Sequence, residues 1–252
     1  MIPYFSFTEI NLSIITIQVW GLMASIGFLL ALFLSLKEAE RKNVDKDDIW
    51  NALILALIGM IIGSKIFYII SNFSEFNNLT EIFNLNFGFS FLGGASFAGI
   101  LLFIYARYKK INVLKLADTI TLGAILAMIA IRTGCFLIYD HFGKITDLPW
   151  GRIYLDGTIR HPVILYHIIN VLAIFLIICY FKKRNLRDGL LFLYFVICYL
   201  TSRFLTDFLR CSDLNICDAH YLNLTYTQWF ISILIFPVIY LIIKTQNSDE
   251  KV

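Results

Sequence analysis

Long, uninterrupted apolar segments restrict the fold of this chain more than any other feature of its sequence. Each is about 20 residues long, the length of α-helix that crosses about 30 Å of hydrocarbon. Charged residues make up only 15% of the chain and hydrophobic residues 59%, whereas about a quarter of an ordinary soluble domain is charged. The sequence therefore predicts an all-α, polytopic membrane protein with seven transmembrane helices, placed at about 14 to 36, 49 to 71, 88 to 106, 114 to 139, 162 to 181, 189 to 209 and 225 to 244.

The segments between these helices are short. Seven spans use about 147 residues, so we expect residues 1–252 to form a single membrane domain without a sizeable soluble part. The loop at about 140 to 161 contains the turn signals Leu148-Pro149, Asp156-Gly157 and His161-Pro162. It predicts a small ordered cap outside the membrane. The loops at about 72 to 87 and 210 to 224 are expected on the same side.

Lysines and arginines are distributed unevenly over the two sides of the predicted bundle. One side carries Lys37, Arg41, Lys42, Lys46, Arg107, Lys109, Lys110, Lys115, Lys182, Lys183, Arg184, Arg187, Lys244 and Lys251. The other side carries Lys144, Arg152, Arg160 and Arg210. Because cytoplasmic loops are rich in Lys and Arg, we expect the N-terminus outside and the C-terminus in the cytoplasm. A net charge of +3 without a basic stripe argues against a nucleic-acid partner.

Lys65, Arg132 and Arg203 fall inside the predicted spans. A charged side chain there costs several kcal/mol unless it is paired or lines a polar cavity. Arg203 lies about 21 Å along its helix from Gly189, in the outer third of the membrane, and Arg132 also lies toward the outer end of its span. Two guanidinium groups at this depth suit an anionic phosphate that enters from the lipid.

The sixth predicted span repeats this pattern at helical spacing. Tyr199, Arg203 and Asp207 are four residues apart and therefore share one helix face, and Arg210 follows one turn beyond Asp207. The alternative to a phosphate site is an internal ion pair between Arg203 and Asp207 that only holds helices together.

Two other features of the spans have simple explanations. Lys65 has Glu38, Glu40 or a lipid phosphate as conceivable partners, and its side chain could also extend toward the interface. The small residues of segment 93–99 allow helices to approach closely, which favours a packing role. The same glycines could open a groove the width of a lipid.

Cysteines give little indication of a metal or disulfide framework. Cys135, Cys179 and Cys198 fall in apolar spans, where a buried thiol is the usual role. Cys211 and Cys217 share an outer loop, and the sequence leaves their pairing open. No metal-ligand spacing is present, so we expect no metal site.

Histidines are few, and three of them lie in outer loops. His141, His161 and His220 are each candidates for a base near neutral pH, although a lone loop histidine is usually solvated. His167 begins the fifth predicted span.

Six segments, in order, resemble motifs of the prolipoprotein diacylglyceryl transferase family of seven-helix bacterial inner-membrane enzymes. The resemblance covers nearly the whole chain, and six ordered motifs are far more specific than any one. The matching segments are residues 18–23 (Gln-Val-Trp-Gly-Leu-Met), 91–99 (Phe-Leu-Gly-Gly-Ala-Ser-Phe-Ala-Gly), 131–136 (Ile-Arg-Thr-Gly-Cys-Phe) with Asp140 and Gly143, 149–151 (Pro-Trp-Gly), 161–166 (His-Pro-Val-Ile-Leu-Tyr) and 203–210 (Arg-Phe-Leu-Thr-Asp-Phe-Leu-Arg).

The chain departs from these motifs at four positions. Ala98 replaces the family's histidine in the Gly-Gly segment, and Cys135 replaces its signature asparagine. Trp20 stands in place of a tyrosine and Ile164 in place of a glutamine. If the family's histidine acts as a base, this chain needs another group, relies on a thiol that ionises unaided near the arginines, or is inactive.

The resemblance implies transfer of the diacylglyceryl group from phosphatidylglycerol to the lipobox cysteine thiol of a prolipoprotein signal peptide. This reaction belongs to lipoprotein biosynthesis, takes place in the bilayer of the bacterial cytoplasmic (inner) membrane, and needs no cofactor.

The resemblance also assigns roles to residues. Arg132 and Arg203 are expected to hold the phosphodiester and stabilise the leaving phosphate, with Tyr199 orienting the headgroup or relaying a proton. Asp207 would fix the guanidinium of Arg203. The expected lipid-binding set is completed by Gly143, Arg210, Gly93, Gly94, Ser96, Trp20 and Lys65.

His161 is the leading substitute for the missing base, because it lies in a matched motif at the outer surface, and His141 is the second. The alternative function is a non-catalytic membrane protein that binds an anionic lipid on the same scaffold, which Ala98 favours. A small-anion transporter is a weaker alternative, because the spans lack paired Gly or Pro interruptions.

Overall fold

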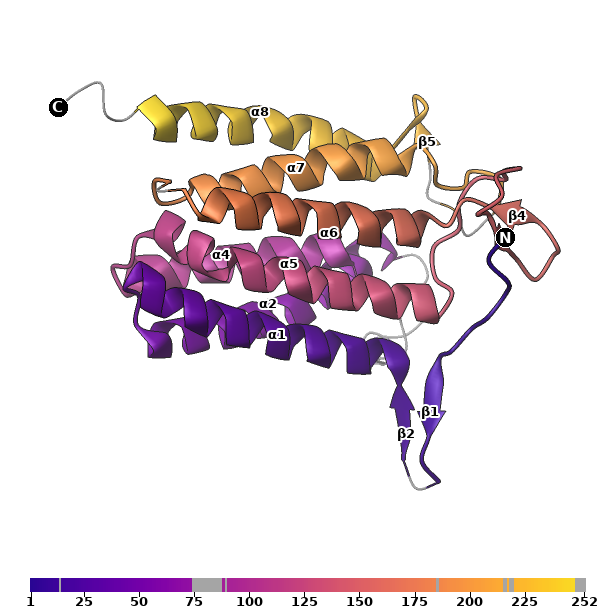
Figure 1. Ribbon diagram of the computed structural model, residues 1–252, viewed down its shortest axis with the longest axis horizontal. Helices are drawn as coiled ribbons and strands as arrows, with labels where there is room; N and C mark the ends of the chain where they lie inside the picture. The colour runs from indigo at the N-terminus through magenta and orange to yellow at the C-terminus, as the bar shows by residue number, and fades with distance from the viewer. Residues whose placement is uncertain are drawn as a thin grey trace. The chain divides into compact units, whose positions relative to one another are not determined.

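The computed structural model describes residues 1–13, 15–73, 88, 90–184, 186–214, 217 and 220–247. Its long helices are α1 (Val19–Lys42), α2 (Lys46–Ser71), α4 (Phe91–Tyr108), α5 (Val113–Leu137), α6 (Val163–Lys182), α7 (Leu190–Asp207) and α8 (Tyr226–Gln246) (Figure 1). Six of them, all except α4, are long and apolar enough to cross a membrane. The 18-residue α4 has a single charged side chain, Arg107, near its end. The predicted all-α, polytopic membrane fold is confirmed; residues 74–87 of the expected loop at about 72 to 87 lie outside the described residues.

The chain divides into two compact units. The larger unit contains residues Met1–Leu34 and Ile120–Val252, and the smaller unit contains Ser35–Thr119. The boundaries fall inside α1 and α5, so each of these helices contributes to both units. Arg132 and Arg203 belong to the larger unit, and Lys65 belongs to the smaller one.

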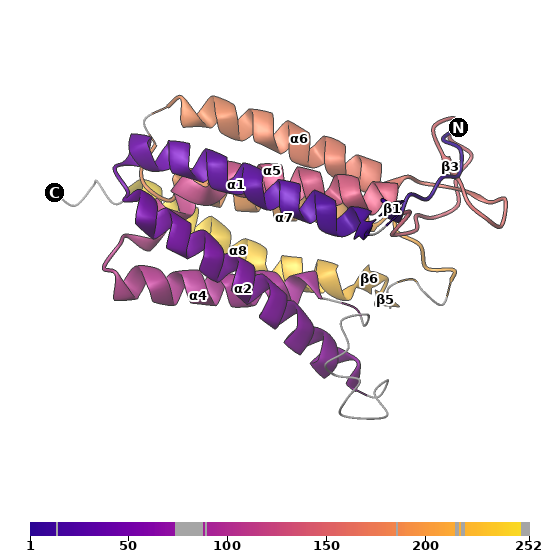
Figure 2. The ribbon, with the colours of Figure 1, turned by 90° about the horizontal axis from the view of Figure 1, so that it is seen from below.

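Close backbone contacts hold the smaller unit together, where α2 packs along α4 (Figure 2). A Cβ atom added to Gly63 would lie 2.6 Å from the carbonyl oxygen of Gly93 and would overlap the Phe97 side chain. One added to Gly94 would lie 2.8 Å from the carbonyl oxygen of Met60. Only glycine allows the two helices to approach this closely. The sequence allows segment 93–99 either to pack against another helix or to open a groove for a lipid. The structure shows helix packing at Gly93 and Gly94.

We expect Gly63→Ala to destabilise the smaller unit, because the new methyl group has no space between α2 and α4. Overpacking of this kind costs about 1–3 kcal/mol, so thermal unfolding in detergent should begin several degrees lower. The matched control is Gly99→Ala on α4, where an added Cβ atom meets nothing within 4 Å. Equal melting temperatures for the two variants would contradict this account of the packing.

The core of the larger unit lies between α5, α6 and α7, which run side by side (Figure 2). Its buried side chains are Leu122, Ile125, Val171, Ile174, Ile178, Leu191 and Phe195. On the other side, α7 packs against α8. Large apolar side chains such as Leu176 and Phe236 point outward and are exposed. This pattern suits helices surrounded by lipid, because outward apolar groups need no polar cover there.

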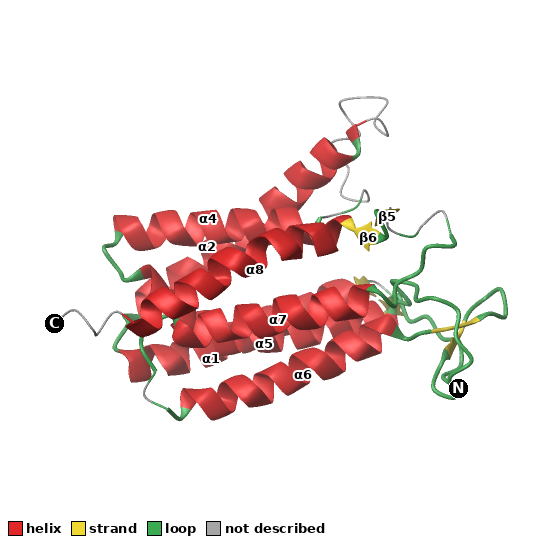
Figure 3. Cartoon of the chain, turned by 90° about the horizontal axis from the view of Figure 1, so that it is seen from above, coloured by secondary structure: helices red, strands yellow, loops and turns green. Residues whose placement is uncertain are grey.

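Three small antiparallel sheets lie at the end of the larger unit where α5 ends and α6 begins (Figures 1 and 3). They pair β1 (Glu9–Asn11) with β2 (Thr16–Gln18), β3 (Arg152–Ile153) with β4 (Ile159–Arg160), and β5 (His220–Tyr221) with β6 (Leu224–Thr225). The β3–β4 hairpin forms part of the expected cap, and its turn places Gly157 at φ 78°. A disulfide joins Cys211 to Cys217 in the loop before β5. The sequence alone leaves open whether these two cysteines are bridged.

The first helix begins later than expected. The sequence places its start at about residue 14, whereas α1 begins at Val19. Residues before it form the β1–β2 hairpin, in which Glu9 pairs with Gln18 and Ile10 with Ile17. The Gln18 side chain also donates a hydrogen bond of 2.8 Å to Glu9 Oε1. Strands of three residues are too short to give a period-two pattern that hydropathy can detect.

Two arginines attach the cap to the rest of the larger unit. Arg160 donates hydrogen bonds to both carboxylate oxygens of Asp213, at 3.0 and 2.7 Å. This pairing lowers the pKa of Asp213 and raises that of Arg160. Arg152 lies 4.0 Å from the Tyr139 ring centre and donates to the carbonyl oxygen of Phe136 at 3.2 Å. The cap is therefore held by partly buried contacts of two arginine side chains.

Candidate functional site

Arg203 lies on α7 with partners on both sides of its guanidinium group. Its Nη2 atom is 3.1 Å from Oδ1 of Asp207, one helical turn away. Its Nη1 atom donates a hydrogen bond to Nε2 of His167, which lies on α6. Asp207 is buried and also accepts a hydrogen bond of 3.4 Å from Thr225, at the start of α8. Partners from α6 and α7 therefore hold the guanidinium in one position.

The sequence does not single out His167, because it is one polar residue at the start of an apolar helix. A guanidinium only donates hydrogen bonds, so Nε2 of His167 accepts and the ring proton is assigned to Nδ1. Nδ1 can then donate to Thr206 Oγ1 at 3.3 Å, and Thr206 donates to the Ser202 carbonyl oxygen at 2.9 Å. His167 is thus a neutral group that positions Arg203. A polar side chain directly after a matched motif and inside a span is the signal that could have found it.

Arg132, on α5, joins a second group of side chains. Its guanidinium lies within hydrogen-bonding range of Tyr199 on α7 and of the Cys135 thiol one turn along α5. Cys135 is also within hydrogen-bonding range of the Trp20 side chain on α1. Tyr199 is one turn from Arg203 on the same helix. The fold of the larger unit therefore brings Trp20, Arg132, Tyr199 and Arg203 into one cluster.

Gly143 lies where three backbone segments meet. It forms a β-bridge with Arg210, and the neighbouring Cys211 nitrogen donates to the Phe142 carbonyl oxygen at 3.0 Å. A Cβ atom added at position 143 would lie 2.9 Å from the Cβ atom of His161 and closer still to its carbonyl oxygen. A side chain is excluded there, so the loop that follows α5 can be held against the end of α7.

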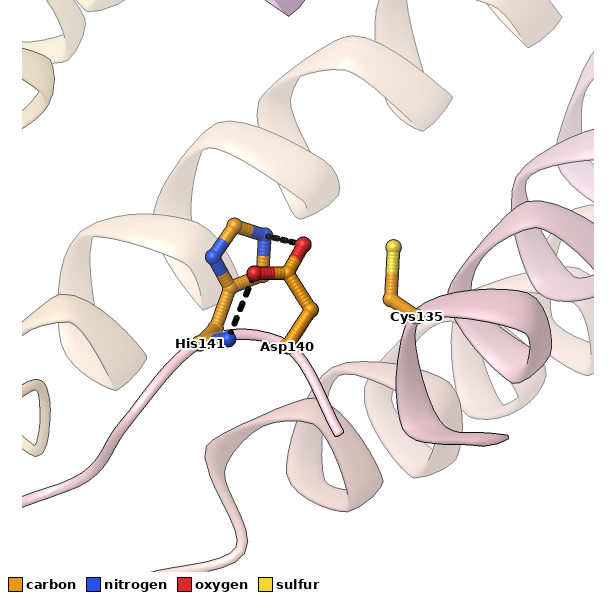
Figure 4. Close-up of side chains that lie close together, drawn as sticks. All are labelled: Cys135, Asp140 and His141. Carbon is orange, nitrogen blue, oxygen red and sulfur yellow. Dashed lines mark hydrogen bonds and ion pairs between the residues drawn. The ribbon is translucent and has the colours of Figure 1, made fainter. Parts of the chain in front are cut away.

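Asp140 and His141 begin this loop and lie close to Cys135 (Figure 4). The His141 backbone nitrogen donates to Oδ1 of Asp140 at 2.9 Å, and its ring Nε2 lies 3.5 Å from Oδ2. The thiol, carboxylate and imidazole atoms that face one another are all within 4.8 Å. The sequence analysis has Asp140 only as part of a matched motif and His141 as the second candidate for the base, and both lie near the arginines.

Three arginines, Arg132, Arg203 and Arg210, set the electrostatics of this loop. Burial and their positive charges hold the pKa of His141 well below its usual value, so the imidazole is neutral at pH 7. Burial raises the pKa of the Asp140 carboxyl group. The same excess of positive charge opposes a divalent cation and favours an anion. The cluster is therefore suited to a phosphate.

His161, the leading candidate for a base, lies in a different network. The Tyr166 hydroxyl is 3.2 Å from its Nδ1 atom and also accepts a hydrogen bond of 2.9 Å from the Trp150 indole. Burial and the charge of Lys144 lower the pKa of His161. The side-chain partner of His161 is thus Tyr166 at the start of α6, whereas the groups that act on His141 include the arginine cluster.

Comparison with known proteins shows the family of this chain. Residues 8–244 match the family model described as prolipoprotein diacylglyceryl transferase. This chain belongs to that family. The chain is 36% identical over 177 residues to the phosphatidylglycerol–prolipoprotein diacylglyceryl transferase of Clostridioides difficile strain 630, covering 69% of this chain and 71% of the relative. It is 32% identical over 175 residues to the protein of the same name from Streptococcus uberis, covering 66% of this chain and 68% of the relative. It is 27% identical over 252 residues to the protein of that name from Streptococcus suis strain 05ZYH33, covering 96% of this chain and 92% of the relative.

Membership of the prolipoprotein diacylglyceryl transferase family makes this chain a transferase and a multi-pass membrane protein. The structure shows which groups surround three of the residues at which the sequence departs from the motifs it resembles: Trp20, Cys135 and Ala98. Trp20 and Cys135, two of the exchanged residues, lie within hydrogen-bonding range of each other. Ala98 is buried on α4, where a Cβ atom on Gly59 would lie 2.8 Å from its Cα atom.

The remaining predicted residues belong to the smaller unit. Gly93 and Gly94 are buried in the contact between α2 and α4, whereas Ser96 is exposed on α4. Lys65 is half-buried on α2. A lipid-binding role for these four residues stays a prediction.

Proposed function

We propose that this protein transfers the diacylglyceryl group of phosphatidylglycerol to the lipobox cysteine thiol of a prolipoprotein. The observation that carries this proposal is the cluster in which Arg132 and Arg203, from two apolar helices, both lie near Tyr199. Family membership supports the same reaction, and the names of the relatives state both substrates. No cofactor is needed, because the donor lipid supplies the leaving group.

The reaction is a displacement at carbon. The thiolate sulfur attacks the glycerol carbon of the diacylglyceryl group that bears the phosphate, forming a C–S bond. The C–O bond to the phosphate breaks, and its electron pair leaves with glycerol phosphate. The proton of the thiol goes to a base and then to solvent. Negative charge therefore grows on the phosphate oxygen in the transition state.

The arginines are placed to stabilise that charge. Arg203 has its orientation fixed by Asp207 and His167, so its donors need no rearrangement when the phosphate begins to leave. Arg132 and Tyr199 approach from the side of α5, and Arg210 adds positive charge at the outer end of α7. Such preorganised donors bind the transition state better than the resting lipid.

We place this chemistry at the outer face of the bacterial cytoplasmic membrane. The excess of Lys and Arg on the opposite side of the spans favours an outside N-terminus and an outside cap. The Cys211–Cys217 disulfide supports the same orientation, because disulfides persist outside the cytoplasm. A signal peptide anchored in the bilayer would present its lipobox cysteine at this depth.

The test is a reaction of purified protein with a lipobox peptide in micelles of defined lipid. Phosphatidylglycerol should give a peptide heavier by one diacylglyceryl group, whereas phosphatidylethanolamine should not. A peptide with serine in place of the lipobox cysteine is the matched control. Lipidation of the serine peptide, or equal use of both lipids, would contradict the proposal.

Ala98 favours a second candidate, a relative that binds anionic lipid without transferring it. The same assay separates the two functions. Retention of phosphatidylglycerol with no lipidated peptide would support the binding protein.

A further inference from the structure

The transfer reaction needs a group that takes the proton of the substrate thiol, whose free pKa is about 8.5. Ala98 cannot do so, and its side chain is packed in the smaller unit. All four histidines of the chain lie among the described residues, so each can be considered as the base. This question arises only if the proposed transfer function is right, and the inference below rests on it.

Three histidines are poorly placed for this task. Both ring nitrogens of His167 have partners, Arg203 and Thr206. His161 faces the hydroxyl of Tyr166, at the start of α6. His220 lies in the short strand β5. His141 is the histidine for which the described residues show a ring nitrogen within 4.8 Å of both a carboxylate oxygen and the Cys135 thiol.

We propose that His141, oriented by Asp140, is the proton acceptor for the substrate thiol. The Asp140 carboxylate lies beside Nε2 of His141, which favours the tautomer with its proton on that atom. Nδ1 then carries the lone pair that accepts the proton. The arrangement is that of a base held by a carboxylate, as in other sites that activate a thiol or hydroxyl nucleophile.

The ring nitrogen of His141 that faces Asp140 and Cys135 is Nε2, whereas Nδ1 lies on the far side of the ring (Figure 4). Cys135 Sγ is within 4.8 Å of the facing atoms of both Asp140 and His141 (Figure 4), and it lies beside the guanidinium of Arg132. A substrate thiol would therefore approach the imidazole from the side opposite Asp140 and Cys135 to give its proton to Nδ1, while Arg210, Arg132 and Arg203 supply positive charge around the ring.

The loop that carries His141 is firmly held. Tyr139 and His141 have φ angles of 69° and 58°, in the left-handed region that residues other than glycine seldom adopt. Such conformations persist where surrounding contacts determine them, and they cluster at functional sites. Here the Asp140 nitrogen donates to the Cys135 carbonyl oxygen at 3.1 Å, and the Gly143–Arg210 bridge fixes the far end.

The charged groups around His141 explain when it can act. The positive charges of three arginines, Arg132, Arg203 and Arg210, disfavour the protonated imidazole. The other titratable neighbours of His141 are Asp140, Cys135 and the neutral His167. The phosphodiester of a bound lipid would offset part of this positive charge. Proton transfer to His141 therefore becomes easier once the lipid is in place, and the same arginines stabilise the thiolate.

The test compares the pH dependence of peptide lipidation in wild-type protein, His141→Asn and His161→Asn. Loss of a general base typically costs about a hundredfold or more in rate, so we expect this loss in kcat for His141→Asn with little change in the KM for phosphatidylglycerol. The wild-type rate should be level between about pH 7 and the thiol pKa, whereas the rate of His141→Asn should rise about tenfold per pH unit until the thiol ionises. His161→Asn should lose less activity and keep the level profile.

Chemical rescue gives a readout that a purely structural role would not produce. Added imidazole should restore part of the activity of His141→Ala, and Asp140→Asn should weaken the pH-independent rate without abolishing it. Full activity in His141→Asn, or the rising profile in His161→Asn instead, would overturn the inference while leaving the transfer function intact. A wild-type protein that forms no product would overturn both.

Discussion

Arg203→Ala should reduce kcat for lipid transfer by about 100- to 1000-fold, the usual cost of removing one preorganised donor to a developing anion. The variant should also unfold more readily, because the buried Asp207 carboxylate loses the cation that lies 3.1 Å away. Breaking such a buried pair costs about 3–5 kcal/mol. Initial rates of peptide lipidation and thermal unfolding in detergent measure the two effects.

A second substitution separates the two consequences. In Arg203→Leu combined with Asp207→Asn, no buried charge is left alone, so stability should recover while activity stays low. Arg184→Ala is the control for the loss of an arginine as such, because Arg184 is exposed and pairs with Tyr180 at the opposite end of the bundle. Near-normal turnover in the double variant would end the catalytic role of Arg203.

Gly143→Ala should be the most damaging substitution in the cap. The added methyl group would overlap the backbone carbonyl of His161. The two segments are held together by the hydrogen bond from the His161 nitrogen to the Lys144 carbonyl oxygen at 2.9 Å, and Gly143 is also held by its bridge to Arg210. We expect a loss of about 2 kcal/mol or more in the free energy of unfolding. Lipidation activity should fall as well, because the loop with Asp140 and His141 would shift.

Gly157→Ala tests whether that effect comes from crowding. Gly157 lies in the same cap at φ 78°, but a Cβ atom added to it meets nothing within 4 Å. It should cost only about 1–2 kcal/mol of backbone strain and leave lipidation nearly unchanged. Similar losses in both variants would mean that the cap is generally sensitive, not that position 143 is crowded.

The helices of this protein could be predicted well because their signal is strong. A run of about 20 apolar residues has few stable forms other than a buried or membrane-spanning helix. The spacing of Tyr199, Arg203 and Asp207 likewise predicted their common face, and Arg203 and Asp207 do lie one turn apart in contact. Such features depend on local geometry, which the order of residues fixes.

Contacts between distant segments were harder to predict. His167 meets Arg203 across 36 positions of sequence, and nothing near His167 indicates that partner. His161 ranked above His141 because it lies in a matched motif, yet it is His141 that the left-handed backbone turns toward the arginines. The β1–β2 hairpin and the Arg160–Asp213 pair also depend on tertiary placement that periodicity does not encode.

The most direct test of the transfer function is to quantify both products of one reaction. Purified protein is incubated with phosphatidylglycerol and a lipobox peptide, and the lipidated peptide and free glycerol phosphate are measured over time, beside Arg132→Ala. We predict equal molar amounts of the two products, and the loss of both in the variant. Phosphatidylglycerol that binds but yields neither product, or equal yields from Arg132→Ala, would contradict the account.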